Sequence, residues 1–197
     1  MPNISLCEDQ GSIYYNPFVL ETRLVCKYNI PSTSYPTVLR TNYEQNIFKS
    51  MEIDGVMLDE LVTEYTFDTT GIHTVKYELY DETKLGNNAP VFYNSYLIKA
   101  IIPDGVTIIG SNTFVNCQGL TEIIMPSSIT SINSASFANC INLISVIIKA
   151  ITPPILNGSA FDSTNNCIFY VPSNSINIYK AENIWENYRD RIQAIQD

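Results

Sequence analysis

The stretch Leu120-Thr-Glu-Ile-Ile-Met-Pro126-Ser-Ser-Ile-Thr-Ser-Ile132, continued by Phe137-Ala-Asn-Cys140-Ile-Asn-Leu143, decides the fold because its landmark residues recur every 23 positions. The recurring sets are Leu97, Leu120 and Leu143; Pro103, Pro126 and Pro172, with Lys149 in the intervening place; Ile109, Ile132 and Ile155; Phe114 and Phe137; and Cys117 and Cys140. A constant period in the twenties indicates a solenoid, in which each unit buries its apolar side chains against the units before and after it.

This pattern resembles the BspA-like, or Treponema-type, leucine-rich repeat of bacterial surface proteins. The resemblance rests on a short strand that ends at Pro126 and on Phe137 and Cys140 in the returning segment. The closing stretch Phe169-Tyr-Val-Pro172, with Tyr179-Lys180, Trp185 and Tyr188, is similar to the C-terminal cap of that family. Two departures are a one-residue insertion before Phe161, which stands 24 after Phe137, and Asn166 where a leucine is expected.

Composition and charge restrict the class of protein. The chain has 197 residues, 45% of them hydrophobic, and a net charge of −9, which repels a phosphate backbone and argues against nucleic acid and anionic membranes as partners. No apolar run approaches the roughly 18 to 20 residues of a membrane span, and the first nine residues lack the basic and apolar regions of a secretory signal peptide. Residues 1–96 hold six basic and thirteen acidic side chains against five and seven in residues 97–197, which favours two domains.

The first half of the chain has a β pattern. Strands are predicted at 18–28, 37–41 and 47–53, with a hairpin turn at Asp54-Gly55 returning through 56–58. A further strand pair is predicted from 64–67 and 72–80 across the turn at 68–71, and it resembles the last hairpin of immunoglobulin-like or PKD-like modules. We therefore expect a leader at 1–16, an immunoglobulin-like β-sandwich at 17–84 and the repeat domain at 85–197, joined nearly rigidly.

A capping helix is predicted at the end of the repeats. Ser173 or Ser175 can serve as its N-cap, and the helix is expected to run through Tyr179, Trp185 and Tyr188 to about residue 195. A solenoid needs its open end covered, so a structural role is favoured over partner binding. The predicted fold is thus mainly β, with an immunoglobulin-like sandwich, a short solenoid of 23-residue repeats and a C-terminal capping helix.

The sequence offers little catalytic chemistry. His73 is the only histidine, and no nucleophile motif, phosphate loop or dinucleotide turn surrounds it, so neither an enzyme nor a cofactor is expected. The acidic group Asp54, Asp59, Glu60 and Glu64 lacks the spacing of a calcium loop, and a solvated acidic face is favoured. Cys117, Cys140 and Cys167 are interpreted as buried hydrophobic residues, with no metal site. A carboxylate pair for sugar hydrolysis would depend on the fold.

What remains is the exposed face of the repeat sheet. Alternation sends Leu120, Ile123 and Met125, and their equivalents in the neighbouring repeats, inward. The residues predicted to point outward, a candidate interaction surface, are Ile98, Lys99, Ile101, Thr121, Glu122, Ile124, Ile144, Ser145, Ile147, Ile168 and Tyr170, with Cys167 beside them. Stacking at 23 residues aligns Ile101, Ile124, Ile147 and Tyr170 in one apolar row. Such a row marks an interface, or it reflects the preference of strands for β-branched residues and is shielded by the sandwich or the cap helix.

We therefore expect a non-catalytic adhesion or protein-binding module that uses this face. The resemblance implies a bacterial cell-surface or extracellular location and attachment to a protein or glycan. The alternative is a structural protein, such as a phage-like or appendage component, that forms a homo-oligomer through the same face. Neither interpretation involves nucleic acid or insertion into a membrane.

Overall fold

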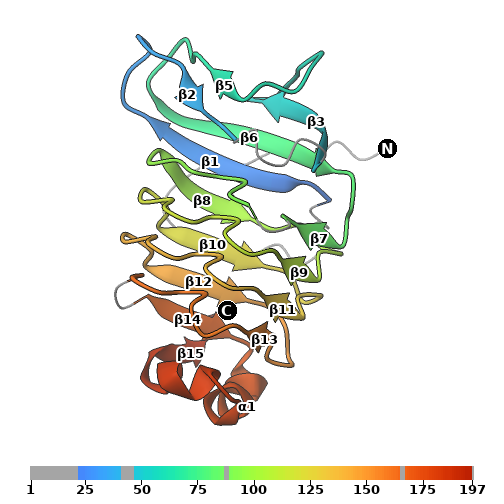
Figure 1. Cartoon of the computed structure of the whole chain (residues 1–197), viewed down its shortest axis with the longest axis vertical. Helices are drawn as coiled ribbons and strands as arrows, with labels where there is room; N and C mark the ends of the chain where they lie inside the picture. The colour runs from blue at the N-terminus through green and yellow to red at the C-terminus, as the bar shows by residue number, and fades with distance from the viewer. Residues whose placement is uncertain (1–21, 41–46, 87–88, 165–166, 197) are drawn as a thin grey trace.

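The computed structural model describes residues 22–40, 47–86, 89–164 and 167–196. Within this part the chain coils into a stack that carries one large sheet, one short sheet and a small third ladder (Figure 1). The predicted leader at 1–16 lies outside the described residues. None of the described helices has the length and apolar character needed to cross a membrane.

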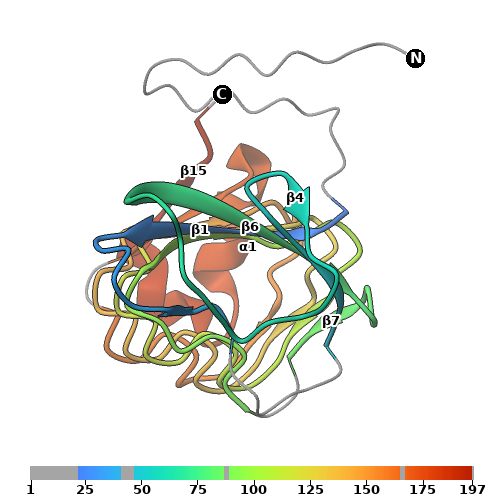
Figure 2. The ribbon, with the colours of Figure 1, turned by 90° about the horizontal axis from the view of Figure 1, so that it is seen from above.

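Nine strands of the described chain form the large sheet, and it runs the whole length of the stack. In spatial order they are β15 (Ile192–Ala194), β14 (Ile168–Val171), β12 (Ser145–Ile148), β10 (Glu122–Met125), β8 (Leu97–Ile101), β1 (Leu24–Ile30), β6 (Gly71–Leu79), β3 (Phe48–Ile53) and β4 (Val56–Met57). Figure 2 shows β1 and β6 crossing the molecule at one side of the coils. One face of this sheet therefore covers the core, and the other is the outer face.

In the parallel part of this sheet, residues that are 23 positions apart are paired across neighbouring strands. Glu122 is paired with Lys99 on one side and with Ser145 on the other. The residues predicted from alternation to point inward are buried, which confirms this prediction: Leu97, Ala100, Ile102, Leu120, Ile123, Met125, Leu143, Val146 and Ile148 are all at most 3% exposed.

A short second sheet carries the opposite side of each coil. Its strands are β7 (Lys84–Leu85), β9 (Ile108–Ile109), β11 (Ser131–Ile132) and β13 (Ile155–Leu156). The prediction that Ile155 continues the row of Ile109 and Ile132 is wrong, because Leu156 is paired with Ile132 and buried while Ile155 is 73% exposed. The residue that is inserted in this coil therefore lies before Ile155 in the sequence.

The insertion leaves the aromatic core intact. Phe92, Phe114, Phe137 and Phe161 stack ring on ring, with successive centroids 5.1, 5.2 and 5.1 Å apart. The ring of Phe161 then meets Phe169 edge to face at 5.0 Å, so the column turns toward the cap. Asn166, the other departure from the repeat pattern, lies outside the described residues.

The cap is not the continuous helix that the sequence predicts. A 3₁₀ helix η1 (Ser173–Ser175), α1 (Ile176–Ala181), a second 3₁₀ helix η2 (Trp185–Arg191) and β15 follow one another. Tyr179 and Trp185 are both fully buried. In one continuous α-helix, a separation of six residues would point their side chains about 120° apart. The break, with Ile184 at φ 67°, lets both rings face the core, where Tyr179 donates to the Ala150 carbonyl and Trp185 to the Pro154 carbonyl. β15 then pairs with β14.

The described residues before residue 85, which we call the first unit, also differ from the predicted immunoglobulin-like sandwich. β1, β6, β3 and β4 join the repeat sheet, because β1 pairs antiparallel with both β6 and β8. The expected pairing of 64–67 with 72–80 is absent from the described residues, since β5 (Glu64–Tyr65) pairs instead with β2 (Thr37–Val38) in a separate two-stranded ladder. An open edge at β8 would leave its backbone groups unpaired. The first unit covers that edge and extends the solenoid sheet.

Buried polar contacts connect the β2–β5 ladder to β1 and to the repeats. The Tyr28 hydroxyl donates to the Leu39 carbonyl at 2.9 Å. The Asn94 side-chain amide donates to the Val38 carbonyl, and its oxygen accepts from the Leu97 backbone N–H at 3.2 Å. One continuous hydrophobic core runs from Leu24 to Ile192. The division at 84/85 stays a prediction, and the two parts share this core.

Candidate functional site

One row of residues crosses the outer face of the large sheet at right angles to its strands. Ile101, Ile124, Ile147 and Tyr170 are direct neighbours in consecutive strands, as the 23-residue period predicts. Each side chain is partly exposed. We call these four residues the apolar row. A contiguous row of this kind on a solvent-facing sheet is the feature that most often marks a binding surface.

A second row lies beside the apolar row, and it is polar in its centre. Ile168, Ser145, Glu122 and Lys99 are paired across β14, β12, β10 and β8. Lys99 and Glu122 form an ion pair, with side chains only 26% and 19% exposed. The Oε1 atom of Glu122 is fully buried and has no hydrogen-bond partner among the described residues besides this adjacent ammonium. The polar row is therefore desolvated in part even in the isolated chain.

The remaining predicted residues lie where the strands begin. Thr121 donates its hydroxyl to the Ile98 carbonyl at 2.9 Å, which links two coils at this edge. Ile144 is 66% exposed. A shallow hollow of about 490 Å³ opens here, lined by Gly119, Thr121, Ile141, Asn142, Leu143, Ile144 and Ile168. That all eleven predicted residues form one interaction surface stays a prediction, whereas Cys167, which alternation also sent outward, is 1% exposed and belongs to the core.

Sequence reasoning missed the part of this face that the first unit supplies. Val25 of β1 is paired with Ile101 at the end of the apolar row, but its side chain is only 6% exposed. Lys27 of β1 is paired with Lys99, so it continues the polar row. Period-2 alternation in β1 could have grouped Val25 with Lys27. Nothing in the sequence indicates that β1 lies against β8.

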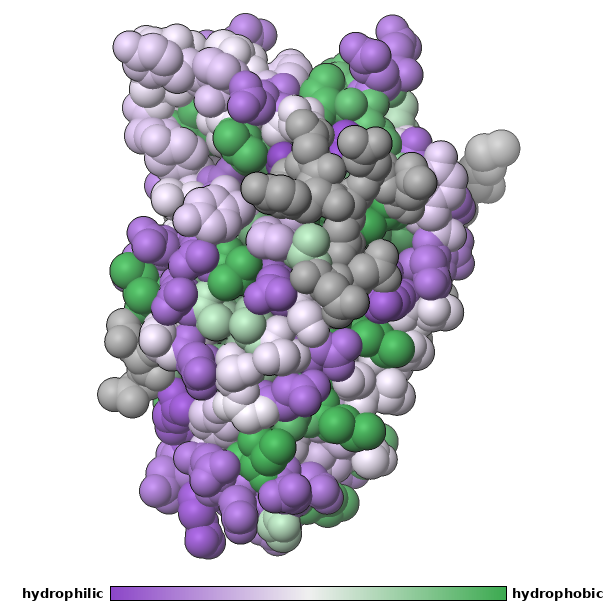
Figure 3. All heavy atoms as spheres, in the orientation of Figure 1, coloured by the Kyte–Doolittle hydropathy of each residue, from purple (hydrophilic) through white to green (hydrophobic). Residues whose placement is uncertain are grey.

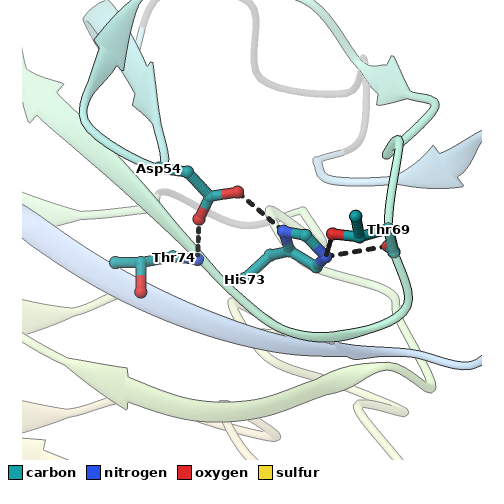
Figure 4. A network of polar contacts seen from close by, with 4 residues as sticks. All are labelled: Asp54, Thr69, His73 and Thr74. Atoms are coloured by element: carbon teal, nitrogen blue, oxygen red, sulfur yellow. Dashed lines mark hydrogen bonds and ion pairs between the residues drawn. The ribbon is translucent and has the colours of Figure 1, made fainter.

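His73 forms a compact polar network in the first unit, shown in Figure 4. Its Nδ1 lies 2.6 Å from an Asp54 carboxylate oxygen, and its Nε2 lies 2.9 Å from the Thr69 carbonyl. The other Asp54 oxygen accepts the Thr74 backbone N–H at 2.8 Å. Both ring nitrogens thus have partners, and the ring is only 8% exposed and packs against Phe67 at 4.3 Å. The network holds the turn at Asp54 against the turn before β6, and no ring nitrogen faces a substrate site.

The described part of the chain contains no cluster of metal ligands and no exposed thiol. No group of three His, Cys, Asp or Glu side chains gathers there as metal ligands, and the Asp54 oxygens of the acidic group are already in use. Cys26, Cys117, Cys140 and Cys167 are free and buried. Burial raises the pKa of the Cys117 thiol to about 12, so this thiol is protonated at neutral pH.

Outside the area covered by grey atoms, the side of the molecule shown in Figure 3 carries no comparable row. Hydrophobic residues there form small separate groups between hydrophilic ones. Ile151 and Ile155, at the start of the last coil of the short sheet, are 59% and 73% exposed. Single exposed apolar residues are normal on protein surfaces. The outer face of the large sheet remains the strongest candidate.

Comparison with known proteins agrees with the repeat geometry. A family model described as the BspA type leucine rich repeat region matches residues 83–186, in six copies. This range begins just before β7, includes every parallel strand from β8 to β14, and ends within the cap. No curated protein matches the chain.

Proposed function

This chain belongs to the BspA-type leucine-rich repeat family, and from that premise we propose that it is a non-catalytic module that binds a protein partner through the outer face of its large sheet. The family indicates a protein-interaction role in general. The observation that carries the finer proposal is the apolar row, which four consecutive strands hold in direct register. We place this role at a bacterial cell surface or in the extracellular space, in attachment to a host or neighbouring-cell protein.

The physical basis is the division between the two faces of the sheet. The inner face is filled by fully buried Leu, Ile and Phe side chains, so its composition is set by folding. The outer face is not needed for that core, yet it presents isoleucines and a tyrosine. Binding energy at protein interfaces is concentrated in a few apolar and aromatic residues that become desolvated at the centre. The apolar row has the composition and position of such a centre.

A paired substitution tests the use of this face. Ile124→Thr with Ile147→Thr keeps the β-branched shape at both positions and removes apolar surface only from the outer face. The matched control is Ile151→Thr with Ile155→Thr, since both of these isoleucines are exposed away from the apolar row. The probes are peptides selected from a random phage-displayed library on the wild-type chain, together with a panel of immobilised extracellular-matrix proteins.

We expect the row variant to melt close to the wild type and to lose most binding to the selected probes, while the control variant retains it. Retained binding in the row variant would mean that the working surface lies elsewhere. Unfolding of the row variant would show that the row is part of the core.

Self-association through the same face is the second candidate, because an apolar row that is continuous across the stack can also meet its copy in an assembly protein. Sedimentation of the wild type and the row variant separates the two. A wild-type oligomer that dissociates in the row variant supports assembly, and a monomer in both supports a different partner.

A further inference from the structure

We infer that the partner of the outer face is an acidic polypeptide segment, which places a carboxylate at Lys27 and an apolar side chain on the apolar row. This inference rests on the proposed function, because it assumes that the face binds a protein. It adds the chemical class of the partner and names Lys27 as the residue that selects it.

Lys27 lies at the centre of the outer face. It is paired with Lys99 on one side and with Thr74 on the other, so two lysines are direct neighbours across the strands, and the ammonium of Lys99 is in contact with Glu122. Like charges in that position are destabilising. Lys27 has no ion-pair or hydrogen-bond partner for its ammonium among the residues that the structure describes, and its side chain is partly exposed. An uncompensated cation at the centre of a sheet does not stabilise the fold, but it can bind an anionic group of a partner.

Two carboxylates of the strands around Lys27 already have cationic partners. Glu52 binds Arg23 at 2.7 Å and Lys76 at 3.6 Å, and Glu122 binds Lys99. Lys76 is paired with Val25, so it lies diagonally next to Lys27 on the same face. The centre of the face therefore has more cations than anions, although the chain as a whole carries a net charge of −9. Because salt screens charges beyond about 8 Å at physiological ionic strength, a bound group experiences this local surplus.

The apolar row decides which kind of anion fits. Ile101 lies in the strand of Lys99, next to the strand of Lys27, and is paired with Ile124 in the following strand. A nucleic acid or a sulfated glycan has no aliphatic side chain to cover these residues, whereas a peptide supplies both an apolar side chain and a carboxylate. Strands are about 4.8 Å apart and alternate side chains about 6.7 Å apart, so Lys27 and Ile124 are separated by about 12 Å. An extended peptide covers that distance in three or four residues.

The test uses the same random phage-displayed library, now read for its consensus. We expect enriched peptides to carry Asp or Glu three or four positions from an apolar or aromatic residue. Binding of a synthetic consensus peptide should fall about tenfold in Lys27→Glu, because one favourable charge contact is replaced by a repulsive one. The matched control Lys180→Glu makes the same change in net charge on α1 and should bind like the wild type. Binding should also weaken as salt is raised.

A stability measurement separates recognition from folding. Lys27→Glu removes the Lys27–Lys99 repulsion and puts opposite charges in register, so its melting temperature should equal or exceed that of the wild type while binding falls. Lys27→Gln is the milder variant and should lose less affinity in the same direction. A loss of binding that merely follows a loss of stability overturns the inference.

The outcomes distinguish this inference from the proposed function. Peptides that depend on Ile124 and Ile147 but carry no acidic consensus, and that bind Lys27→Glu normally, overturn the acidic partner and leave the protein-binding face standing. Peptides that bind the double threonine variant as tightly as the wild type overturn the proposed function itself. Heparin serves as a counter-probe: if it binds in a Lys27-dependent manner and no acidic peptide does, the ligand is an anionic glycan and the inference fails.

Discussion

The rings of Phe114 and Phe137 lie parallel, with their centroids 5.2 Å apart and their planes 8° from each other. These residues occupy the same place in two consecutive coils, so their separation reports the spacing of the stack. Phe92 and Phe161 extend the column on either side with nearly the same spacing. The column continues through Phe169 to Trp185 in the cap, whose rings are 5.5 Å apart. At the other end, Phe92 meets Tyr77 of β6 edge to face at 5.7 Å, so aromatic packing connects the first unit, the repeats and the cap.

Truncation of one ring in this column should be costly. Phe137→Ala removes a fully buried side chain from between two stacked neighbours, and we expect it to lower the free energy of unfolding by about 3–5 kcal/mol. Denaturant unfolding followed by circular dichroism measures the change. Ile155→Ala is the control, because its side chain is 73% exposed and the loss should stay within about 0.5 kcal/mol. Equal stability of the two variants would contradict the stacking of the coils.

The cysteines of the repeats should resist modification in the native protein. Cys117 and Cys140 are fully buried, the pKa of both thiols is raised by burial, and the Cys140 thiol donates to the Phe114 carbonyl. Because the thiolate is the reactive form, we expect neither thiol to react with a maleimide at pH 7 until the chain is denatured. Mass spectrometry of a Cys7→Ser variant isolates the described cysteines. Rapid labelling of the folded protein at either site would show that the cysteines are accessible to solvent and not buried between the coils.

Gly119 should tolerate no side chain. A methyl group at this position would overlap the Ser95 carbonyl and lie 2.7 Å from its carbon, and both are backbone atoms of the preceding coil. Gly119→Ala should therefore force the two coils apart and cost about 1–3 kcal/mol.

The matched control is Asn142→Ala, 23 residues later. It loses one exposed hydrogen bond to the Gln118 carbonyl and should cost about 1 kcal/mol or less. Comparison of the two melting curves is sufficient, and a Gly119→Ala variant as stable as this control would show that the contact is not tight.

The ion pair of Glu52 predicts a dependence of stability on pH. A hydrogen bond from Arg23 lowers the pKa of Glu52 below its usual range, and the charges of Arg23 and Lys76 add to this effect against partial burial. A carboxylate with a lowered folded-state pKa stabilises the protein above its unfolded-state pKa, about 4.3, and this contribution is lost as the pH falls through the folded value.

Glu52→Gln should therefore be less stable than the wild type at pH 7, and the difference should narrow below about pH 4.3. Urea unfolding at a series of pH values measures it, with Glu64→Gln, an exposed residue of β5, as the control. A difference that stays constant down to pH 2 would show that the ion pair does not contribute.

The repeat core could be predicted from the sequence because a solenoid is a local structure. Each coil contacts the coil 23 residues away, so the period itself places Leu120, Ile123 and Phe137 in the interior and Ile124 outside. The same logic failed at Ile155, where one inserted residue moved the following residue into its place. It also failed in the cap, where burial of both Tyr179 and Trp185 outweighed the helical pattern.

The sequence by itself determined the stacking of the coils, their buried side chains and the apolar row, because a side chain's direction follows from its position within a fixed period. The tertiary structure alone decided that β1 pairs with β8, since any strand with free backbone groups could have covered that edge, and pairing between distant segments leaves no periodic trace in the sequence. That pairing puts Lys27 against Lys99 and Val25 against Ile101. The charge beside the apolar row, and with it the inferred chemistry of the partner, therefore depends on one contact between distant segments of the chain.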